Sequence, residues 1–267
     1  MNNSETAHGK AKDASMKGAS AQESQVSHDQ LEFRQRLEEA FVKTPIPTEE
    51  LMTSMGIYMR SSALVKILVL NDLFRRIHNV PGCIMEFGTR WGQNLIVFEN
   101  LRAIYEPFNK TRKIIGFDTF EGYQGSSNLD KASAIFSEGT YQTTENYPDY
   151  LRQLLSIHEG NNVLGHVSAG HEVIAGNVSN TVASFLELQP ATIVALAYFD
   201  IGLYTPTKDA LQAIKPHLVP GSVILLDQLT WAESPGEAVA FKETFQRSEY
   251  TIEKCALTPM RAIVTIR

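Results

Sequence analysis

Short apolar runs alternate with helical patterns over most of this chain, and this alternation constrains the fold more than any other feature. The runs cover residues 83–87, 113–117, 172–175, 193–199 and 223–226. Strands that alternate with helices pair in parallel, because each helix carries the chain back across the sheet before the next strand begins. The sequence therefore predicts βα units and a mostly parallel sheet.

Two further strand-like runs, residues 250–257 and 261–266, follow with a short Thr258-Pro259-Met260 turn between them. A parallel return needs a crossover of roughly a dozen residues, so strands this close in the chain must be antiparallel. Five βα steps followed by such a hairpin resemble the class I methyltransferase layout. We therefore expect an α/β, Rossmann-like fold with a mostly parallel seven-stranded sheet and an antiparallel hairpin at its C-terminal end.

The segment before the first strand differs in composition. Residues 1–30 are polar and small with almost no large apolar side chains, which predicts a disordered tail. Residues 31–43 and 61–78 carry helical apolar patterns, and we expect residues 31–80 to form a helical lid or a dimerisation segment. We expect residues 81–267 to form the domain with the methyltransferase-like layout. In this domain Thr205 is expected to cap a helix, with Pro206 at the first helical position.

Charge and hydropathy exclude several classes of partner. The formal net charge of −6 argues against nucleic acid, whose binders carry basic patches. The chain shows neither a signal-peptide pattern nor an apolar run of membrane-spanning length, so we expect no membrane partner and a cytoplasmic location. Cys83 and Cys255 lie in apolar runs and are expected to be buried reduced thiols. The apolar faces of the N-terminal helices leave a homo-oligomer open.

Two motifs at strand ends indicate a nucleotide-like ligand. The first strand leads into Glu86-Phe87-Gly88-Thr89-Arg90-Trp91-Gly92, and the second ends at Asp118. Glycines after a first strand let the backbone approach a ligand, and an acid after the second is placed to accept hydrogen bonds from ribose hydroxyls. NAD is disfavoured, because the Gly-x-Gly-x-x-Gly pattern is missing. The alternative is a packing turn with an Asp that caps it.

Acidic and amide side chains also follow the fourth and fifth strands. Asp200 and the pair Asp227-Gln228 are expected at the same edge of the parallel sheet. Their oxygen atoms suit a hard cation such as Mg²⁺, which lowers the pKa of a hydroxyl, and Asp200 is placed to accept the proton. The competing interpretation is that these acids cap the helices that follow their strands.

An ordered set of segments resembles the macrocin O-methyltransferase (TylF-like) family, whose members act on sugars in antibiotic and glycan pathways. The matching segments are Val80-Pro81-Gly82, Glu86-Phe87-Gly88, Phe117-Asp118-Thr119-Phe120-Glu121-Gly122, Gly176-Asn177-Val178-Ser179-Asn180-Thr181, Asp200-Ile201-Gly202-Leu203-Tyr204, Pro220-Gly221-Ser222-Val223-Ile224-Leu225-Leu226-Asp227 and Ser234-Pro235-Gly236-Glu237-Ala238-Val239. The resemblance implies an S-adenosylmethionine-dependent O-methyltransferase that acts on a sugar or glycosylated small molecule.

The resemblance also assigns roles to residues. It implies a cofactor site lined by Glu86, Gly88 and Gly92 with Asp118 near the ribose, to which we add Thr89, Arg90 and Asn177 as candidates. It further implies that Asp200 is the base and a metal ligand, beside an acidic pair that binds Mg²⁺. This chain departs from the pattern, because Gln228 replaces the second Asp of that pair and Gly202 replaces the second acid after the fourth strand.

Other interpretations stay open at this point. His171 or His166 is a candidate base for a metal-free reaction, and Trp91, Tyr123 and Tyr204 are candidates for stacking on adenine or a sugar. The acceptor group is alternatively an amine or a phosphate-linked group, for which a weakened metal site matters less. A non-catalytic methyltransferase-fold binding protein and a nucleotide-sugar oxidoreductase are the remaining hypotheses.

Overall fold

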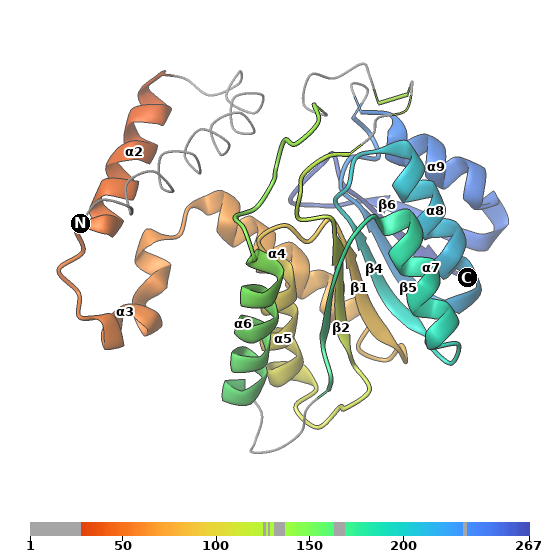
Figure 1. The fold of residues 1–267 in the computed structure, drawn as a ribbon, viewed down its shortest axis with the longest axis horizontal. Helices are drawn as coiled ribbons and strands as arrows, with labels where there is room; N and C mark the ends of the chain where they lie inside the picture. The colour runs from red at the N-terminus through yellow and green to blue at the C-terminus, as the bar shows by residue number, and fades with distance from the viewer. Residues whose placement is uncertain (1–27, 125–126, 128, 131–136, 163–168, 232–233) are drawn as a thin grey trace. The chain divides into compact units, whose positions relative to one another are not determined.

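The computed structural model describes residues 28–124, 127, 129–130, 137–162, 169–231 and 234–267 (Figure 1). Its strands are β1 (Cys83–Phe87), β2 (Ile114–Asp118), β3 (Glu172–Ala175), β4 (Val194–Phe199), β5 (Leu218–Leu226), β6 (Tyr250–Lys254) and β7 (Ala262–Ile266). Its α-helices are α2 (His28–Val42), α3 (Thr48–Ser54), α4 (Ser61–Arg76), α5 (Gln93–Tyr105), α6 (Tyr147–Asn162), α7 (Val178–Leu188), α8 (Tyr204–Ile214) and α9 (Gly236–Thr244), and short 3₁₀ turns are η1 (Met55–Tyr58), η3 (Lys215–His217) and η4 (Arg247–Glu249).

The seven strands form one sheet in the order β3-β2-β1-β4-β5-β7-β6. The first five are parallel, and β7 runs antiparallel to both β5 and β6. The predicted fold class is therefore confirmed. The strand order reverses between β1 and β4, and in open parallel sheets ligands bind at the carboxyl ends of the strands at such a point.

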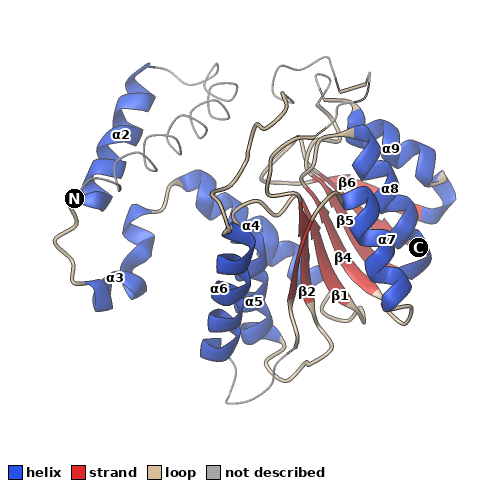
Figure 2. Cartoon of the chain, in the orientation of Figure 1, coloured by secondary structure: helices blue, strands red, loops and turns tan. Residues whose placement is uncertain are grey.

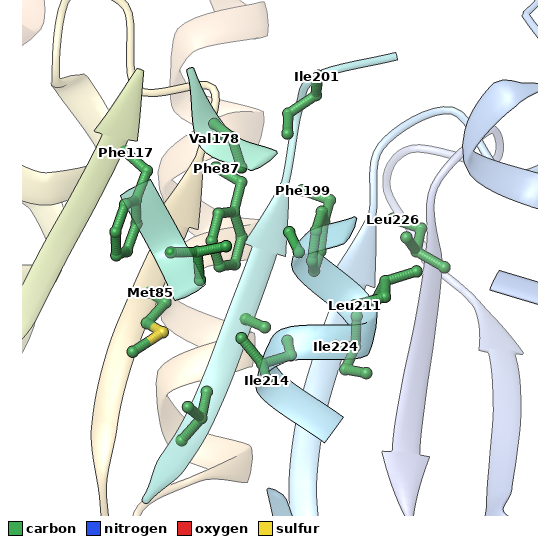
Figure 3. Packing of buried hydrophobic residues seen from close by; sticks show 14 of the residues in the cluster. Met85, Phe87, Phe117, Val178, Phe199, Ile201, Leu211, Ile214, Ile224 and Leu226 are labelled. Carbon is green, nitrogen blue, oxygen red and sulfur yellow. The ribbon is translucent and has the colours of Figure 1, made fainter. Parts of the chain in front are cut away.

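Helices cover both faces of the sheet, with α5 and α6 on one face and α7, α8 and α9 on the other (Figure 2). The core between the sheet and this second layer is built from strand residues that point to that side, together with apolar residues of the helices (Figure 3). Phe87 lies at its centre, with its ring stacked 5.2 Å from Phe117 and 4.5 Å from Phe199. Each such pair adds about 0.5–1.5 kcal/mol to the contribution of apolar burial.

The chain divides into two compact units, Met1–Leu68 and Val69–Arg267, with the boundary inside α4. In the first unit, the rings of Phe41 and Tyr58 pack edge to face, and the Tyr58 hydroxyl bonds Thr44. The last part of α4 belongs to the second unit, because Leu70, Leu73 and Phe74 there are buried.

Most of the predicted tail, residues 1–27, lies outside the described residues, whereas residues 28–30 begin α2. The role of the N-terminal helices as a lid or dimer face stays a prediction. Within the described part of the chain, no helix combines the length and the apolar character that crossing a membrane requires.

The helix α8 begins earlier than predicted. Its N-cap is Leu203 rather than Thr205, and Pro206 falls within the first turn. Backbone N–H groups of a first turn have no acceptor inside the helix, so the N–H that proline lacks removes no helical hydrogen bond there. A residue distant in the chain takes the part of the expected Thr205 cap: the Oδ1 of Asp130 accepts a hydrogen bond from the N–H of Tyr204, the first residue of α8, at 2.9 Å.

Two strands also differ in length from the prediction. β5 begins at Leu218 rather than near residue 223. Its pairing with β4 is irregular between Val194 and Leu196. Pro220 lies in this irregular stretch, where the N–H that proline lacks is not needed for a regular hydrogen bond between the strands. β6 ends at Lys254, so Cys255 lies just beyond it. The N–H of Cys255 donates to the carbonyl of Arg261 at 2.9 Å and so closes a longer turn than predicted.

Candidate functional site

The carboxyl ends of the central strands are held side by side by backbone hydrogen bonds that continue the ladder beyond the strands. These bonds run from Gly88 N to Phe117 O at 3.0 Å, from Asp200 N to Phe87 O at 2.9 Å, from Asp227 N to Phe199 O at 3.1 Å and from Gly176 N to Asp118 O at 2.9 Å. The structure therefore places Gly88, Asp118, Asp200 and Asp227 along one edge of the sheet, as the sequence predicts.

Gly88 lies at the point where the strand order reverses. Its φ is +94°, and a Cβ built there would lie 2.2 Å from the carbonyl oxygen of Asp200. A side chain at this position would collide with backbone, so the glycine lets the loop after β1 approach the residue that follows β4. The loop that the sequence assigns to the cofactor and the candidate base thus meet at Gly88.

Asp118 holds this loop in place. Its Oδ2 accepts from the N–H of Arg90 at 2.7 Å, and its Oδ1 accepts from the N–H of Phe120 at 2.6 Å. Arg90 and Phe120 both have positive φ, +47° and +60°, which is uncommon for residues other than glycine. Burial raises the pKa of Asp118, and the two backbone hydrogen bonds oppose that increase.

Three side chains around the loop after β1, those of Thr89, Arg90 and Asn94, have unused hydrogen-bonding capacity. Glu86, which is 1% exposed, accepts from the side chain of Asn94 at 2.6 Å. Among the described residues, Thr89 Oγ1, Arg90 Nε and Asn94 Oδ1 are buried without a hydrogen-bond partner. Buried polar atoms normally have partners, so their grouping beside the switch point fits a polar ligand such as S-adenosylmethionine.

Two other candidate cofactor residues have structural roles. Gly92 is the N-cap of α5 with φ +73°, and a Cβ there would meet the side chain of Leu151 at 2.3 Å. Asn177 caps α7, because its Oδ1 accepts from the N–H of Ser179 at 2.9 Å. Capping accounts for this contact of the Asn177 side chain, and a role in binding the cofactor stays a prediction.

A buried glutamate, which the sequence analysis did not single out, joins the ends of β4 and β5. Glu237, at the start of α9, is 0% exposed, and its two oxygens accept from the N–H of Gly202 at 3.1 Å and of Gln228 at 2.9 Å. Burial raises its pKa to about 8, and the nearby charges of Asp227 and Asp200 act in the same direction. The carboxyl group therefore orients the loops that carry Asp200 and Asp227.

The expected metal ligands Asp227 and Gln228 have other partners. Arg261 Nε donates to Asp227 Oδ1, and the Tyr198 hydroxyl lies 3.4 Å from the same oxygen. The side-chain oxygen of Gln228 accepts from the hydroxyl of Ser234 at 2.8 Å. In the described ranges no group of three or more His, Cys, Asp or Glu side chains is arranged to hold a metal. These contacts do not fit a Mg²⁺ site formed by Asp200, Asp227 and Gln228.

Aromatic rings surround the site. The guanidinium of Arg90 lies 4.6 Å from the ring centre of Tyr141 and 5.8 Å from that of Trp91, which is 41% exposed. Tyr123 packs edge to face on Tyr141, and the negative charge of Asp200 contributes to the raised pKa of its hydroxyl, which burial raises most. The Tyr204 hydroxyl instead donates to Glu243 on α9 at 2.6 Å, which indicates a packing role.

His171 lies at the opposite end of the sheet, which contradicts its proposed role as a base. It precedes β3, and its Nδ1 accepts from the N–H of Ile114, the first residue of β2. Its Nε2 is 2.7 Å from Glu99, which also pairs with the buried Arg102. Strands of this length separate their two ends by roughly 13–16 Å, so His171 is a structural residue. His166 lies outside the described residues.

Arg261, like Glu237, is a charged residue of the site that the sequence pattern does not reveal, and the sheet register explains its place. Ala262 pairs with Leu226 in the antiparallel β5–β7 ladder, so the preceding Arg261 lies opposite Asp227. The turn between β6 and β7 brings Arg261 to this position. The sequence predicts that turn, but it does not determine how the residues of β7 pair with those of β5.

The calicheamicin methyltransferase CalS11 is similar to this chain along nearly its whole length. Its structure matches with a TM-score of 0.85 and 36% sequence identity, covering 90% of this chain and 93% of that chain. An apo structure of CalS11, described as a TDP-rhamnose 3'-O-methyltransferase of calicheamicin biosynthesis, matches with a TM-score of 0.78 and 35% identity, covering 90% and 95%.

A more distant structure shares the fold alone. The O-methyltransferase NovP matches with a TM-score of 0.58 and 15% identity, covering 76% of this chain and 79% of that chain. No protein-family model and no curated protein matches the chain.

Proposed function

Because this chain belongs to the TylF-like family of class I S-adenosylmethionine-dependent methyltransferases, we propose that it methylates a hydroxyl of a sugar or glycosylated small molecule. The observation that carries this proposal is the 35% identity over 90% of the chain with a TDP-rhamnose 3'-O-methyltransferase. The family makes the chain a methyltransferase and argues against NAD-dependent oxidation.

The methyl donor is S-adenosylmethionine, which supplies a methyl group on a sulfonium sulfur when bound. Its binding residues are Glu86 and the loop from Gly88 to Gly92, with Asp118 beneath that loop. The grouping of buried polar atoms without partners at Thr89, Arg90 and Asn94 supports this placement. In this site Asp118 acts by fixing the backbone of the loop as well as by facing the ribose.

Asp200 is the proposed general base. It follows β4 at the switch point, and its backbone meets the cofactor loop at Gly88. The Asp200 carboxylate would accept the proton of an acceptor hydroxyl held between them. The methyl carbon would then pass to that oxygen as its bond to the sulfonium sulfur breaks, with S-adenosylhomocysteine as the leaving group. Proton transfer to a positioned side chain contributes about 10²–10⁴-fold to such a reaction.

Magnesium assistance stays a prediction that the arrangement of side chains does not favour. Asp227 is paired with Arg261, and the side-chain oxygen of Gln228 is bonded by Ser234. The proposed reaction therefore includes no step that depends on a metal.

Isothermal titration of S-adenosylmethionine and S-adenosylhomocysteine into the purified full chain tests the cofactor, with NAD as the control ligand. A transfer assay with labelled S-adenosylmethionine then tests the acceptor on TDP-rhamnose, related nucleotide sugars and amine- or phosphate-bearing analogues. Transfer to sugar hydroxyls, lost in Asp200→Asn, is the expected result.

Other outcomes select the alternatives. Transfer to amines or phosphates alone would show an N- or phosphate-directed enzyme, and cofactor binding without transfer to any acceptor would favour a binding protein. Failure of both sulfur nucleosides to bind folded protein would overturn the proposal. A homo-oligomeric state and a cytoplasmic location stay predictions.

A further inference from the structure

Arg261 is the candidate for a role that neither the sequence pattern nor the fold assigns. It ends the turn between β6 and β7, and the β5–β7 register places it beside Asp227 at the carboxyl end of β5. Its Nε donates to Asp227 Oδ1, and the two side chains are 17% and 16% exposed. This ion pair is therefore largely shielded from water, at the edge of the sheet where the acids of the site gather.

The surroundings of this pair are strongly acidic. Asp200 and Asp227 follow the neighbouring strands β4 and β5, and the buried carboxyl group of Glu237 bonds the backbone of Gly202 and Gln228 beside them. Arg261 pairs directly with Asp227, which follows the strand next to the one that Asp200 follows. Carboxylates brought together in a partly buried site repel each other unless a cation compensates them, and an arginine can supply that charge as a divalent ion would.

The same contacts disfavour a metal at this place. A cation bound by Asp227 would have to displace the guanidinium from Oδ1, and a cation bound by Gln228 would have to displace the hydroxyl of Ser234. A divalent ion beside an undisplaced Arg261 would meet a like charge. Hard cations also prefer carboxylates to amides, and the position after Asp227 holds Gln228.

We propose that Arg261 takes the place of the divalent cation in this methyltransferase, so that its guanidinium balances Asp227 and Asp200 and methyl transfer needs no metal. The link to methyl transfer rests on the proposed function, whereas the exclusion of a metal by Arg261 does not. Arg261 acts through Asp227, as a positioning residue, and compensates the negative charge beside Asp200.

Binding of Mn²⁺ tests the exclusion of the metal without a methyl donor or acceptor. The full-length wild type, Arg261→Met and the control Arg247→Ala are each titrated with Mn²⁺, and free Mn²⁺ is measured by electron paramagnetic resonance. Arg247 is an exposed residue on η4, just before β6. We expect no site in the wild type or in Arg247→Ala, and an affinity at least about tenfold higher in Arg261→Met, because the guanidinium then no longer competes with the ion for Asp227.

Two results of the Mn²⁺ titration would overturn the proposal. One is a Mn²⁺ site in the wild type that Asp227→Asn abolishes, and the other is no gain of Mn²⁺ binding in Arg261→Met. Arg261→Gln, which retains a hydrogen-bond donor to Asp227, replaces the Met variant if circular dichroism shows that Arg261→Met does not fold.

Transfer assays separate this proposal from the proposed function. Wild-type methyl transfer should be unchanged in EDTA, and transfer by Arg261→Met should fall at least about tenfold and recover in part with added Mg²⁺. A wild-type enzyme that EDTA inactivates and Mg²⁺ restores would overturn the role of Arg261. A wild type that transfers methyl to no acceptor in either condition would refute the proposed function and leave the Mn²⁺ result as the test of the metal exclusion.

Discussion

Gly88→Ala should damage the site more than its single added methyl group suggests. The native φ of +94° places any other residue in a strained conformation, which costs about 1–2 kcal/mol. The added Cβ would also lie 2.2 Å from the carbonyl oxygen of Asp200, and relief of such a backbone contact costs typically about 1–3 kcal/mol. We expect a total loss of about 2–5 kcal/mol in the free energy of unfolding.

Gly139→Ala is the matched control. Gly139 has φ +76°, and a Cβ built there has no atom within 4 Å. This variant carries the cost of the positive φ and the same entropic change in the unfolded chain, without a collision. The difference between the two variants, about 1–3 kcal/mol, therefore isolates the contact between the cofactor loop and the residue after β4.

Thermal unfolding and ligand titration measure the two effects. For a domain of this size 1 kcal/mol shifts Tm by about 2–4 °C, so Gly88→Ala should melt about 4–20 °C below the wild type. Its Kd for S-adenosylhomocysteine should rise at least about tenfold, whereas Gly139→Ala should bind as the wild type does. Equal Tm values for the two alanine variants, or an unchanged Kd in Gly88→Ala, would refute the reasoning.

Four further predictions follow from the site and its supports. Asp200→Asn should lower kcat about 10²–10⁴-fold with an unchanged Kd for S-adenosylmethionine, and a kcat near that of the wild type would remove Asp200 as the base. Asp118→Asn should leave one of the backbone N–H groups of Arg90 and Phe120 without an acceptor, at a cost of about 1–3 kcal/mol. Titrations should therefore show weaker binding of S-adenosylhomocysteine, and an unchanged affinity would show that the loop does not depend on this carboxylate. His171→Gln should lower Tm through loss of its contacts with Ile114 and Glu99 while kcat stays near that of the wild type, and a large loss of kcat with an unchanged Tm would restore the histidine as a catalytic candidate. Burial raises the pKa of the Cys83 thiol to about 12, so native protein at about pH 8 should resist alkylation of Cys83 until it unfolds, and rapid labelling detected by mass spectrometry in folded protein would contradict this.

The local pattern of the sequence is sufficient to predict the sheet and the positions of most site residues. β1 and β3 have the predicted bounds, and the short connection between β6 and β7 correctly predicts an antiparallel pair. Asp118, Asp200 and Asp227 lie at one edge of the sheet because the carboxyl ends of parallel strands lie together. These features depend on periodicity and chain connectivity, which a single sequence displays directly.

The contacts of those residues depend on the tertiary structure. The sequence does not show that Arg261 pairs with Asp227, that Glu237 joins the loops after β4 and β5, or that His171 lies at the far end of the sheet. Each contact depends on strand register or on helix placement, because one residue of slip in a strand would direct its side chains to the other face. The sequence by itself determined the fold and the edge of the sheet at which the candidate site residues gather, whereas only the packing of elements distant in the chain decided that Arg261 pairs with Asp227 there.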